Sequence, residues 1–557
     1  MKINFNIEIK RRVGRLEIKI LSGYIWSKVV VLTLTMLVFP FSIDALTEEA
    51  TQKKKISQEE RLEELEKEVR ELKEEIRRMK GEGDKGVIEG KEGTKIEEKE
   101  PETVTKVPTE VEKKEGKGAL EYLAERVKLG GYGSFRYEYL TAAHEDLNTF
   151  TLRRLVLTTD ARPVDRLTIY AELEFERFLQ IEVEESTVSE EGGLIFEQEI
   201  ESSNESEIAL EQAWLQFDYA ENHGLRLGAI LVPLGRFNLY HDDNLYDFNR
   251  RTITDRQGPV LPVAAAWDEL GAGLNGNFDL GDKGGLNYQF YVMNGATLEG
   301  QIETVIETTP DESKIELEGT LDLSPGGFSA DLNGNKAYTG RIAYSPFLGA
   351  EIGGSFYVGQ YTPDSLGINK YITGFGGDTK FSIGPFDVEA EYIYTHFQDA
   401  KEVVERFAEL TVNSEVEGEI EDLIVELAFE SPMIAKNKQG FWLSLTYHFW
   451  PEFLNKTPLG SPFENPDLRL VGRYEIVNFD DLFTKVGFED GLITALETDD
   501  RTEQLITLGF SYRPIPSVGL IFNVEIGDLI EGDALIFPQD VEADKFFAFT
   551  AGGVFGF

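Results

Sequence analysis

The chain has 557 residues, a formal net charge of −46 and no cysteine. The lack of cysteine excludes disulfides, thiolate metal sites and cysteine nucleophiles. The acidic balance excludes a nucleic-acid partner, because phosphate binding needs a basic surface. None of the five histidines stands in a metal-ligand spacing such as HExxH. The sequence therefore predicts no metal site and no cofactor.

An apolar segment, VVVLTLTMLVFPF, occupies residues 29–41 and follows a run of basic residues. It is too short to span a bilayer as a helix and is typical of the hydrophobic core of a secretory signal peptide. We expect residues 1–45 to be this signal, with cleavage after Ala45. No apolar run of about 18 residues recurs after it, so we expect an exported product without a membrane-spanning helix.

Residues 46–80 are predicted to contain a coiled-coil helix. Ser57 and Glu60 form a capping box, and Gly81 ends the helix. The apolar seam follows the a/d spacing of a heptad, at Leu62, Leu65, Val69, Leu72, Ile76 and Met79. In parallel copies the g positions Arg61, Glu68 and Glu75 face e positions of opposite charge, at Glu66, Lys73 and Lys80. This pairing favours self-association over packing on its own domain, but the seam does not fix the number of strands.

The following segment, residues 81–126, is rich in Glu, Lys, Gly, Thr and Pro and has few large apolar residues. Such a composition predicts a flexible linker, and we expect a short helix at its end, over Ala119–Arg126.

From residue 127 to the end, apolar and polar residues alternate with a period of two, as in strands with one apolar face. An even number of such strands is typical of a single-chain outer-membrane barrel. The alternation predicts sixteen strands, over 127–140, 149–160, 166–177, 208–220, 224–232, 269–279, 286–294, 337–345, 348–360, 371–383, 387–397, 439–450, 467–479, 503–514, 517–527 and 545–557. We therefore expect an all-β fold, a sixteen-stranded antiparallel transmembrane β-barrel.

The predicted connections alternate between short turns and long loops, as in membrane barrels. Long loops are expected at 178–207, 233–268, 295–336, 398–438 and 480–502, and the connection at 451–466 is long for the short-turn side.

The last strand, KFFAFTAGGVFGF, ends in Phe557 and carries Phe555 on the same face. It resembles the C-terminal signature of Gram-negative outer-membrane barrels, which implies recognition by the barrel assembly machinery. The alternative is the last strand of a soluble sandwich.

Several stretches resemble the phosphate-selective porins O and P. They are residues 150–175, LRLGAILVPLGRFN at 225–238, WDELGAGLNG at 267–276, YQFYVMNG at 288–295 and the closing Phe557. The resemblance implies a homotrimer of sixteen-stranded barrels, each with a water-filled pore narrowed by its third long loop. Here that loop would be Pro233 to Asp268.

This chain departs from the family in its charge. From residue 127 on, 74 acidic residues stand against 29 basic ones, whereas the family's phosphate preference is attributed to pore-lining lysines and arginines. In the third loop, charges of both signs alternate, at Arg236, Asp242, Asp243, Asp247, Arg250, Arg251, Asp255 and Arg256. They predict either a charged pore constriction or a salt-bridge network that only holds the loop. Wall contacts are expected at Arg136, Arg153 and Arg226.

The leading hypothesis is a passive porin for small hydrophilic solutes or ions, with a mild cation preference. Alternatives are an anion- or phosphate-selective porin and an envelope tether that uses the barrel as an anchor. An enzyme is not expected, because no GxSxG motif is present. Expected partners are outer-membrane lipid, including lipopolysaccharide bridged to acidic loops by divalent ions, and the cell wall. The N-terminal region would lie in the periplasm.

Overall fold

The computed structural model describes residues 7–12, 15–20, 126–141, 146–176, 181–190, 193–202, 207–256, 260–264, 266–308, 314–326, 331, 333–415, 424–429, 433–534 and 545–557. The predicted hydrophobic signal core, coiled coil and linker lie outside these residues, apart from Arg126. Met1–Glu112 and Lys113–Phe557 are separate compact units. In the first, β1 (Ile7–Arg12) pairs with β2 (Arg15–Ile20).

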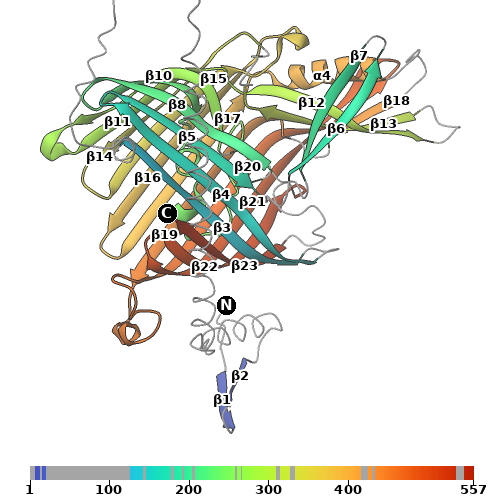
Figure 1. The fold of residues 1–557 in the computed structure, drawn as a ribbon. Coiled ribbons are helices and arrows are strands. Elements are labelled where there is room, and N and C mark those ends of the chain that lie inside the picture. The colour runs from blue at the N-terminus through green and yellow to red at the C-terminus, as the bar shows by residue number, and fades with distance from the viewer. Residues whose placement is uncertain are drawn as a thin grey trace, which may run out of the picture. The chain divides into compact units, whose positions relative to one another are not determined.

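The second unit consists almost entirely of strands (Figure 1). Its strands are β3 (Val127–Thr141), β4 (Asp146–Val164), β5 (Leu167–Glu176), β6 (Ile181–Glu190), β7 (Gly193–Ser202), β8 (Glu207–Ala220), β9 (His223–Leu231), β10 (Asp268–Asp279), β11 (Gly285–Met293), β12 (Thr297–Thr308), β13 (Lys314–Ser324), β14 (Ala337–Ser345), β15 (Ala350–Gln360), β16 (Tyr371–Ile383), β17 (Phe386–Phe397), β18 (Ile424–Phe429), β19 (Ala435–Phe449), β20 (Asp467–Glu489), β21 (Leu492–Ile515), β22 (Val518–Glu531) and β23 (Lys545–Gly556). The helices are α4 (Ala400–Glu415) and the short 3-10 turns η2 (Phe237–Leu239), η3 (Asp243–Leu245), η4 (Gly281–Lys283), η5 (Asp364–Leu366) and η6 (Glu452–Lys456). Among the residues described, no helix is long and apolar enough to cross a membrane.

Sixteen strands close into an antiparallel barrel. The ring runs β3, β4, β5, β8, β9, β10, β11, β14, β15, β16, β17, β19, β20, β21, β22 and β23. β23 then pairs with β3, from Phe547 opposite Thr141 to Gly556 opposite Tyr132. The predicted strand number and order are confirmed, and the bounds agree to within a few residues except at the junction of β20 and β21. A soluble sandwich is excluded because the last strand closes the ring.

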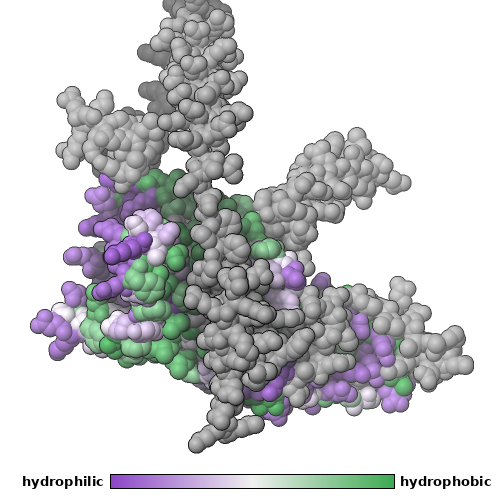
Figure 2. Space-filling view, turned by 90° about the horizontal axis from the view of Figure 1, so that it is seen from below, coloured by the Kyte–Doolittle hydropathy of each residue, from purple (hydrophilic) through white to green (hydrophobic). Residues whose placement is uncertain are grey.

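The barrel wall has two chemically different faces. On β23 the residues Phe546, Ala548 and Thr550 are buried, whereas Phe555 and Phe557 on the alternate face are exposed. Other strands also expose their outward apolar residues, as at Leu152, Phe375 and Leu508. Hydrophobic residues gather over a broad area of the described surface and adjoin hydrophilic ones (Figure 2). An apolar outer face with a polar interior is the arrangement of a lipid-embedded barrel.

The long connections contain more regular structure than the sequence predicted. Residues 178–207 include the β6–β7 hairpin, residues 295–336 include β12 and β13, and residues 398–438 include α4 and β18. β13 pairs in parallel with β18, and β18 pairs with the end of β20. Apolar side chains from these elements are buried together, at Leu298, Leu317, Leu321, Val403, Val404, Val425, Leu427, Val486 and Phe488. The connections between β11 and β19 thus form a packed lobe at the long-loop end.

The prediction of a loop over 480–502 is wrong. β20 and β21 continue as a hairpin to Glu489 and Leu492, joined by Asp490 and Gly491. Both turn residues have positive φ, 52° and 72°, as a two-residue Asp-Gly turn requires. Apolar and polar residues still alternate in this segment, and Val486 and Phe488 are buried in the lobe. The many acidic residues made this alternation hard to recognise in the sequence.

Candidate functional site

Loop 3 is defined here as residues 232–267, between β9 and β10. Hydrogen bonds join its first and last residues. The amide of Val232 donates to the carbonyl of Trp267 at 2.9 Å. The buried Asn238 joins the same two residues, because its Nδ2 donates to the carbonyls of Val232 (2.7 Å) and Trp267 (3.0 Å). Its Oδ1 accepts from the amide of Trp267 at 2.8 Å. This side chain holds both ends of the loop together.

The first part of loop 3 is bound to the wall at β15 and β17. Gly235 N donates to Ser355 Oγ at 2.9 Å, and the amides of Arg236 and Phe237 both donate to Glu391. The guanidinium of Arg236 pairs with Glu351 at 2.7 Å. The next residue after Glu391, Tyr392, is exposed on the opposite face, so these contacts lie inside the barrel.

Asp247 binds the wall at β20 and β21. Its carboxylate accepts from Arg469 Nη1, Arg513 Nε and Ser511 Oγ, each at 2.8 Å. Burial raises the pKa of this carboxyl, but the charges of Arg513 and Arg469 outweigh burial and hold the pKa below its ordinary range. Asp247 is therefore a charged anchor of the loop.

Two loop arginines converge on one wall carboxylate. Glu525 on β22 is buried and pairs with Arg256 Nη2 at 2.8 Å and Arg250 Nη1 at 3.2 Å. Arg250 also pairs with Glu138 on β3 at 2.7 Å. A second wall carboxylate, Glu475 on β20, accepts a hydrogen bond from the loop amide of Ile253 at 2.7 Å. The contacts of loop 3 thus reach strands on opposite sides of the ring.

The remaining predicted loop residues also have partners. Arg251 pairs with Asp255 at 3.4 Å, four residues further on. Asp243 accepts from Ser134 Oγ at 2.5 Å and lies 3.7 Å from Arg154 Nε. Asp242 precedes η3, and its carbonyl accepts from the amide of Leu245. Of the two readings of the loop charges, the described contacts fit a network that holds the loop across the lumen.

The three predicted wall arginines lie in different surroundings. Arg136 donates to the carbonyl of Asn249 in loop 3 at 2.9 Å and pairs with Glu138 at 2.9 Å. Arg226 stacks on the ring of Trp214, with 3.9 Å from its Cζ to the ring centroid. Of these two arginines, only Arg136 has a described interaction with loop 3.

Arg153 lies at a β-bulge. Ser134 pairs with Arg154 and Phe135 with Leu152, so Arg153 is the extra residue. A bulge breaks the strict alternation, which is how both consecutive arginines pair with the inward Glu176, each at 2.5 Å. The sequence predicted Arg153 but not Arg154, whose side chain is fully buried.

Four wall glycines make room for loop 3. A Cβ at Gly440 would lie 2.7 Å from Thr254 Cγ2, and one at Gly374 would lie 2.8 Å from Leu234 Cδ2. Gly376 similarly faces the backbone of Gly235, and Gly552 faces Asn249. At these four positions the loop packs directly against the wall backbone.

A cavity of about 730 Å³ lies at the short-turn end of the barrel. Tyr240 of loop 3 lines it together with turn and wall residues, among them the neutral Gln216, Asn275 and Gln289. Its charged lining residues are balanced in sign, with Arg162, Arg166, Arg226 and Arg341 against Asp165, Asp218, Glu221 and Glu351. Of these residues, the sequence predicted Arg226 as a wall contact, but it gave no indication of the cavity itself.

No family model matches the chain. An uncharacterized protein of Aquifex aeolicus (strain VF5) is 24% identical over 398 residues, which cover 71% of this chain and 74% of that protein. Among solved structures, the outer membrane channel DcaP of Acinetobacter baumannii has a TM-score of 0.40 and 13% identity, covering 77% of this chain and 97% of that one. The anion-selective porin from Comamonas acidovorans has a TM-score of 0.41 and 11% identity, covering 77% and 99%. The assignment of the fold rests on the closed ring of strands itself.

Proposed function

We propose that the protein is a passive diffusion porin of the Gram-negative outer membrane. The observation that carries this proposal is loop 3, which is bound to wall strands around the interior of a closed barrel with an apolar outer face. A loop that folds into the lumen in this way would narrow a water-filled pore. The substrates would be small hydrophilic solutes and ions, because the cavity below the loop is lined by amides and by charges of both signs.

We further propose a mild cation preference. The runner-up, an anion-selective pore, would require free positive charges at the constriction. Arg250 and Arg256 instead share the buried Glu525, and Arg251 pairs with Asp255. Because each of these arginines has a carboxylate partner, the acidic excess of the chain decides the sign. The preference stays mild, since charges in a wide aqueous pore are screened within about 8 Å at physiological salt.

The assembly that we propose is a homotrimer whose N-terminal helices associate in the periplasm. The proposal is supported by the heptad seam and the matched charges at its flanks, as derived from the sequence. A tether to the cell wall would use the same helices, and conductance of a barrel that lacks residues 46–118 separates the two roles.

The test is the reversal potential of the purified protein in a planar bilayer under a tenfold potassium chloride gradient. Two cavity variants form a matched pair: Asp218→Asn should reduce the cation preference, and Arg226→Gln should increase it. A clearly anion-selective potential with micromolar phosphate block, abolished by replacing Arg250, Arg251 and Arg256, would establish the runner-up instead.

A second arm removes the constriction. Replacing residues 234–266 with a short Gly/Ser linker should raise the single-channel conductance and leave heat-modifiable migration intact. A folded barrel without conductance, with or without the loop, would overturn the porin proposal.

A further inference from the structure

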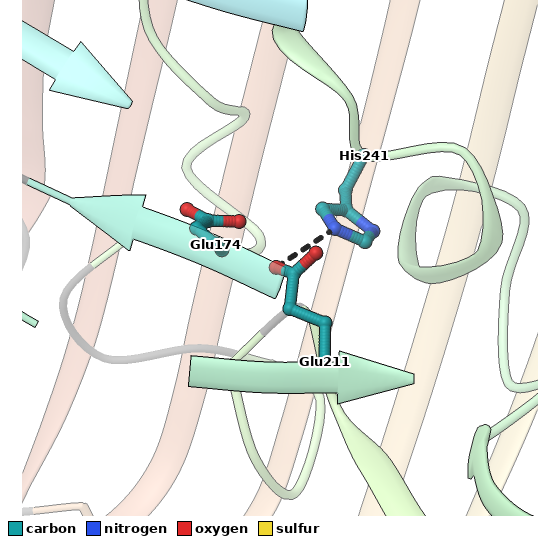
Figure 3. Close-up of side chains that lie close together, drawn as sticks. All are labelled: Glu174, Glu211 and His241. Carbon is teal, nitrogen blue, oxygen red and sulfur yellow. Dashed lines mark ion pairs between the residues drawn. The ribbon is translucent and has the colours of Figure 1, made fainter. Parts of the chain in front are cut away.

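Two glutamates and a histidine meet where loop 3 contacts β5 and β8 (Figure 3). Glu174 comes from β5, Glu211 from β8 and His241 from loop 3, and the three are 3%, 6% and 3% exposed. One potential ligand atom of each residue lies within 4.8 Å of those of the others. Three segments far apart in the sequence thus place a carboxylate, a second carboxylate and an imidazole around one point.

The orientation of His241 is fixed by the base of loop 3. Its Nδ1 lies 3.0 Å from the carbonyl oxygen of Asn238. A carbonyl can only accept, so Nδ1 carries the hydrogen, and in the neutral ring Nε2 presents a lone pair. Nε2 is 3.4 Å from Glu211 Oε1 and has no hydrogen-bond partner. Donation from one ring nitrogen to a carbonyl is the arrangement that orients metal-binding histidines.

The carboxylates also have free oxygens. Arg154 Nε pairs with Glu174 Oε1 at 2.9 Å, whereas Glu174 Oε2 and Glu211 Oε2 are both buried without a hydrogen-bond partner. An unsatisfied buried carboxylate oxygen is destabilising unless the group gains a proton or a cation. Three acceptor atoms therefore face one another, and Arg154 compensates only one side of the cluster.

A second β-bulge brings Glu211 into the interior. Glu172 pairs with Gln212 and Leu173 pairs with Leu210, so Glu211 is the extra residue on β8. Leu210 remains on the exposed outer face. The bulge shifts the pairing register between Glu172 and Leu173 and so places Glu211 inside. Bulges that re-aim one side chain are common beside functional sites.

We propose that Glu174, Glu211 and His241 bind one divalent metal ion of the zinc class. Imidazole with two carboxylates is a ligand set that suits Zn²⁺, and three protein ligands leave a position for water. A cation would satisfy the three acceptors at once, in place of protons shared among Glu174, Glu211 and His241. It joins loop 3 to two wall strands, so the ion would hold the constriction in place next to the anchor at Asn238. This inference goes beyond the proposed function and does not require that the pore conducts.

The experiment measures zinc directly. The full-length protein, folded in detergent, is stripped with a chelator, incubated with Zn²⁺, desalted and analysed by mass spectrometry for metal content. We expect about one Zn²⁺ per chain, retained by His448→Gln and lost from His241→Gln and Glu211→Gln. His448 is the matched control, since its ring lies between Asp387 and Asp467 but is partly exposed and satisfied at both nitrogens.

X-ray absorption at the zinc edge of the wild-type protein distinguishes this site from zinc held by acidic loops. A signal with one imidazole and carboxylate oxygens supports the proposal, and this readout does not depend on the folding of any variant. Failure of the wild-type protein to retain zinc would show that the cluster is neutralised by protons, with His241 charged against Glu211, and would overturn it. Equal retention by a folded His241→Gln variant would overturn it as well.

Discussion

Asp247→Asn should loosen loop 3 without disrupting the barrel. The substitution keeps the shape of the side chain and removes the charge that Arg469 and Arg513 share. Both arginines remain in the wall, where their side chains are 20% and 3% exposed. The barrel ladder does not involve this side chain, so the effect is expected on the loop alone.

The magnitude follows from the burial of the three groups. Removing one partner of a buried ion pair costs roughly 3–5 kcal/mol. The lower value applies here, because asparagine still accepts one hydrogen bond and solvent reaches Arg469. A loss of about 3 kcal/mol changes the equilibrium for local opening of the loop by about 100-fold.

The absence of cysteine from the chain provides the assay. Thr252 is 1% exposed within loop 3, so a thiol in Thr252→Cys reacts with a water-soluble reagent only when the loop opens. In this background Asp247→Asn should raise the labelling rate by about 100-fold. The matched control is Asp218→Asn, since Asp218 accepts its hydrogen bond from the neutral Gln216.

A thiol at the exposed Leu245 reports the accessibility of the loop surface and should label at the same rate in all backgrounds. If Asp247→Asn leaves the labelling of residue 252 unchanged, the pairs with Arg469 and Arg513 do not hold the loop, and the reasoning from burial is refuted.

Acid should act like the Asp247 substitution: because the pKa of this carboxyl is lowered in the docked loop, its stabilisation is complete above the ordinary carboxyl pKa of about 4 and is lost as pH falls through the lowered value. Labelling with a disulfide reagent that reacts in acid should therefore accelerate below about pH 4 in the wild type and less in Asp247→Asn; a parallel pH response of both proteins would contradict this assignment. Phe557→Asp should impair insertion, measured as loss of the heat-modifiable form in cell envelopes, because it places a charge on the outer face of the closing strand; normal insertion would count against the assembly signal. Charge reversal at Glu68 and Glu75 should weaken association of the N-terminal helices, measured by sedimentation, and reversal at Lys73 and Lys80 should restore it; a peptide of residues 56–81 that is monomeric at millimolar concentration would contradict autonomous pairing.

The strands could be predicted because a barrel wall imposes a period of two on every one of them. The prediction failed for residues that face neither the outside nor the interior of the barrel in strict alternation. Residues 480–489 and 492–502 are strand. Their buried side chains pack in the lobe and many of the others are acidic, so the pattern resembled a solvated loop. Arg153 and Arg154 broke the alternation, and the sequence could not distinguish a bulge from an error of register.

The candidate site could be predicted only in part. Loop 3 and its eight charged residues were identified, because opposed charges alternate within one segment. Their partners were not assignable, since Glu525 lies more than two hundred residues from Arg256 in the chain and meets it only after the barrel closes. The cluster of Glu174, Glu211 and His241 was not predicted, because its residues come from three segments and Glu211 faces inward only through a bulge.

The wall glycines allow loop 3 to pack closely against the barrel wall, so the sequences of the loop and the wall depend on each other. At Gly374, Gly376, Gly440 and Gly552, an added Cβ would come within 3.1 Å of an atom of loop 3. A chimera that carries the loop of another barrel would lose these close contacts, and alanine at Gly440 would clash with Thr254 of the native loop. Transfer of loop 3 between barrels therefore requires the loop and its glycines to be transplanted together, although they are scattered along the sequence.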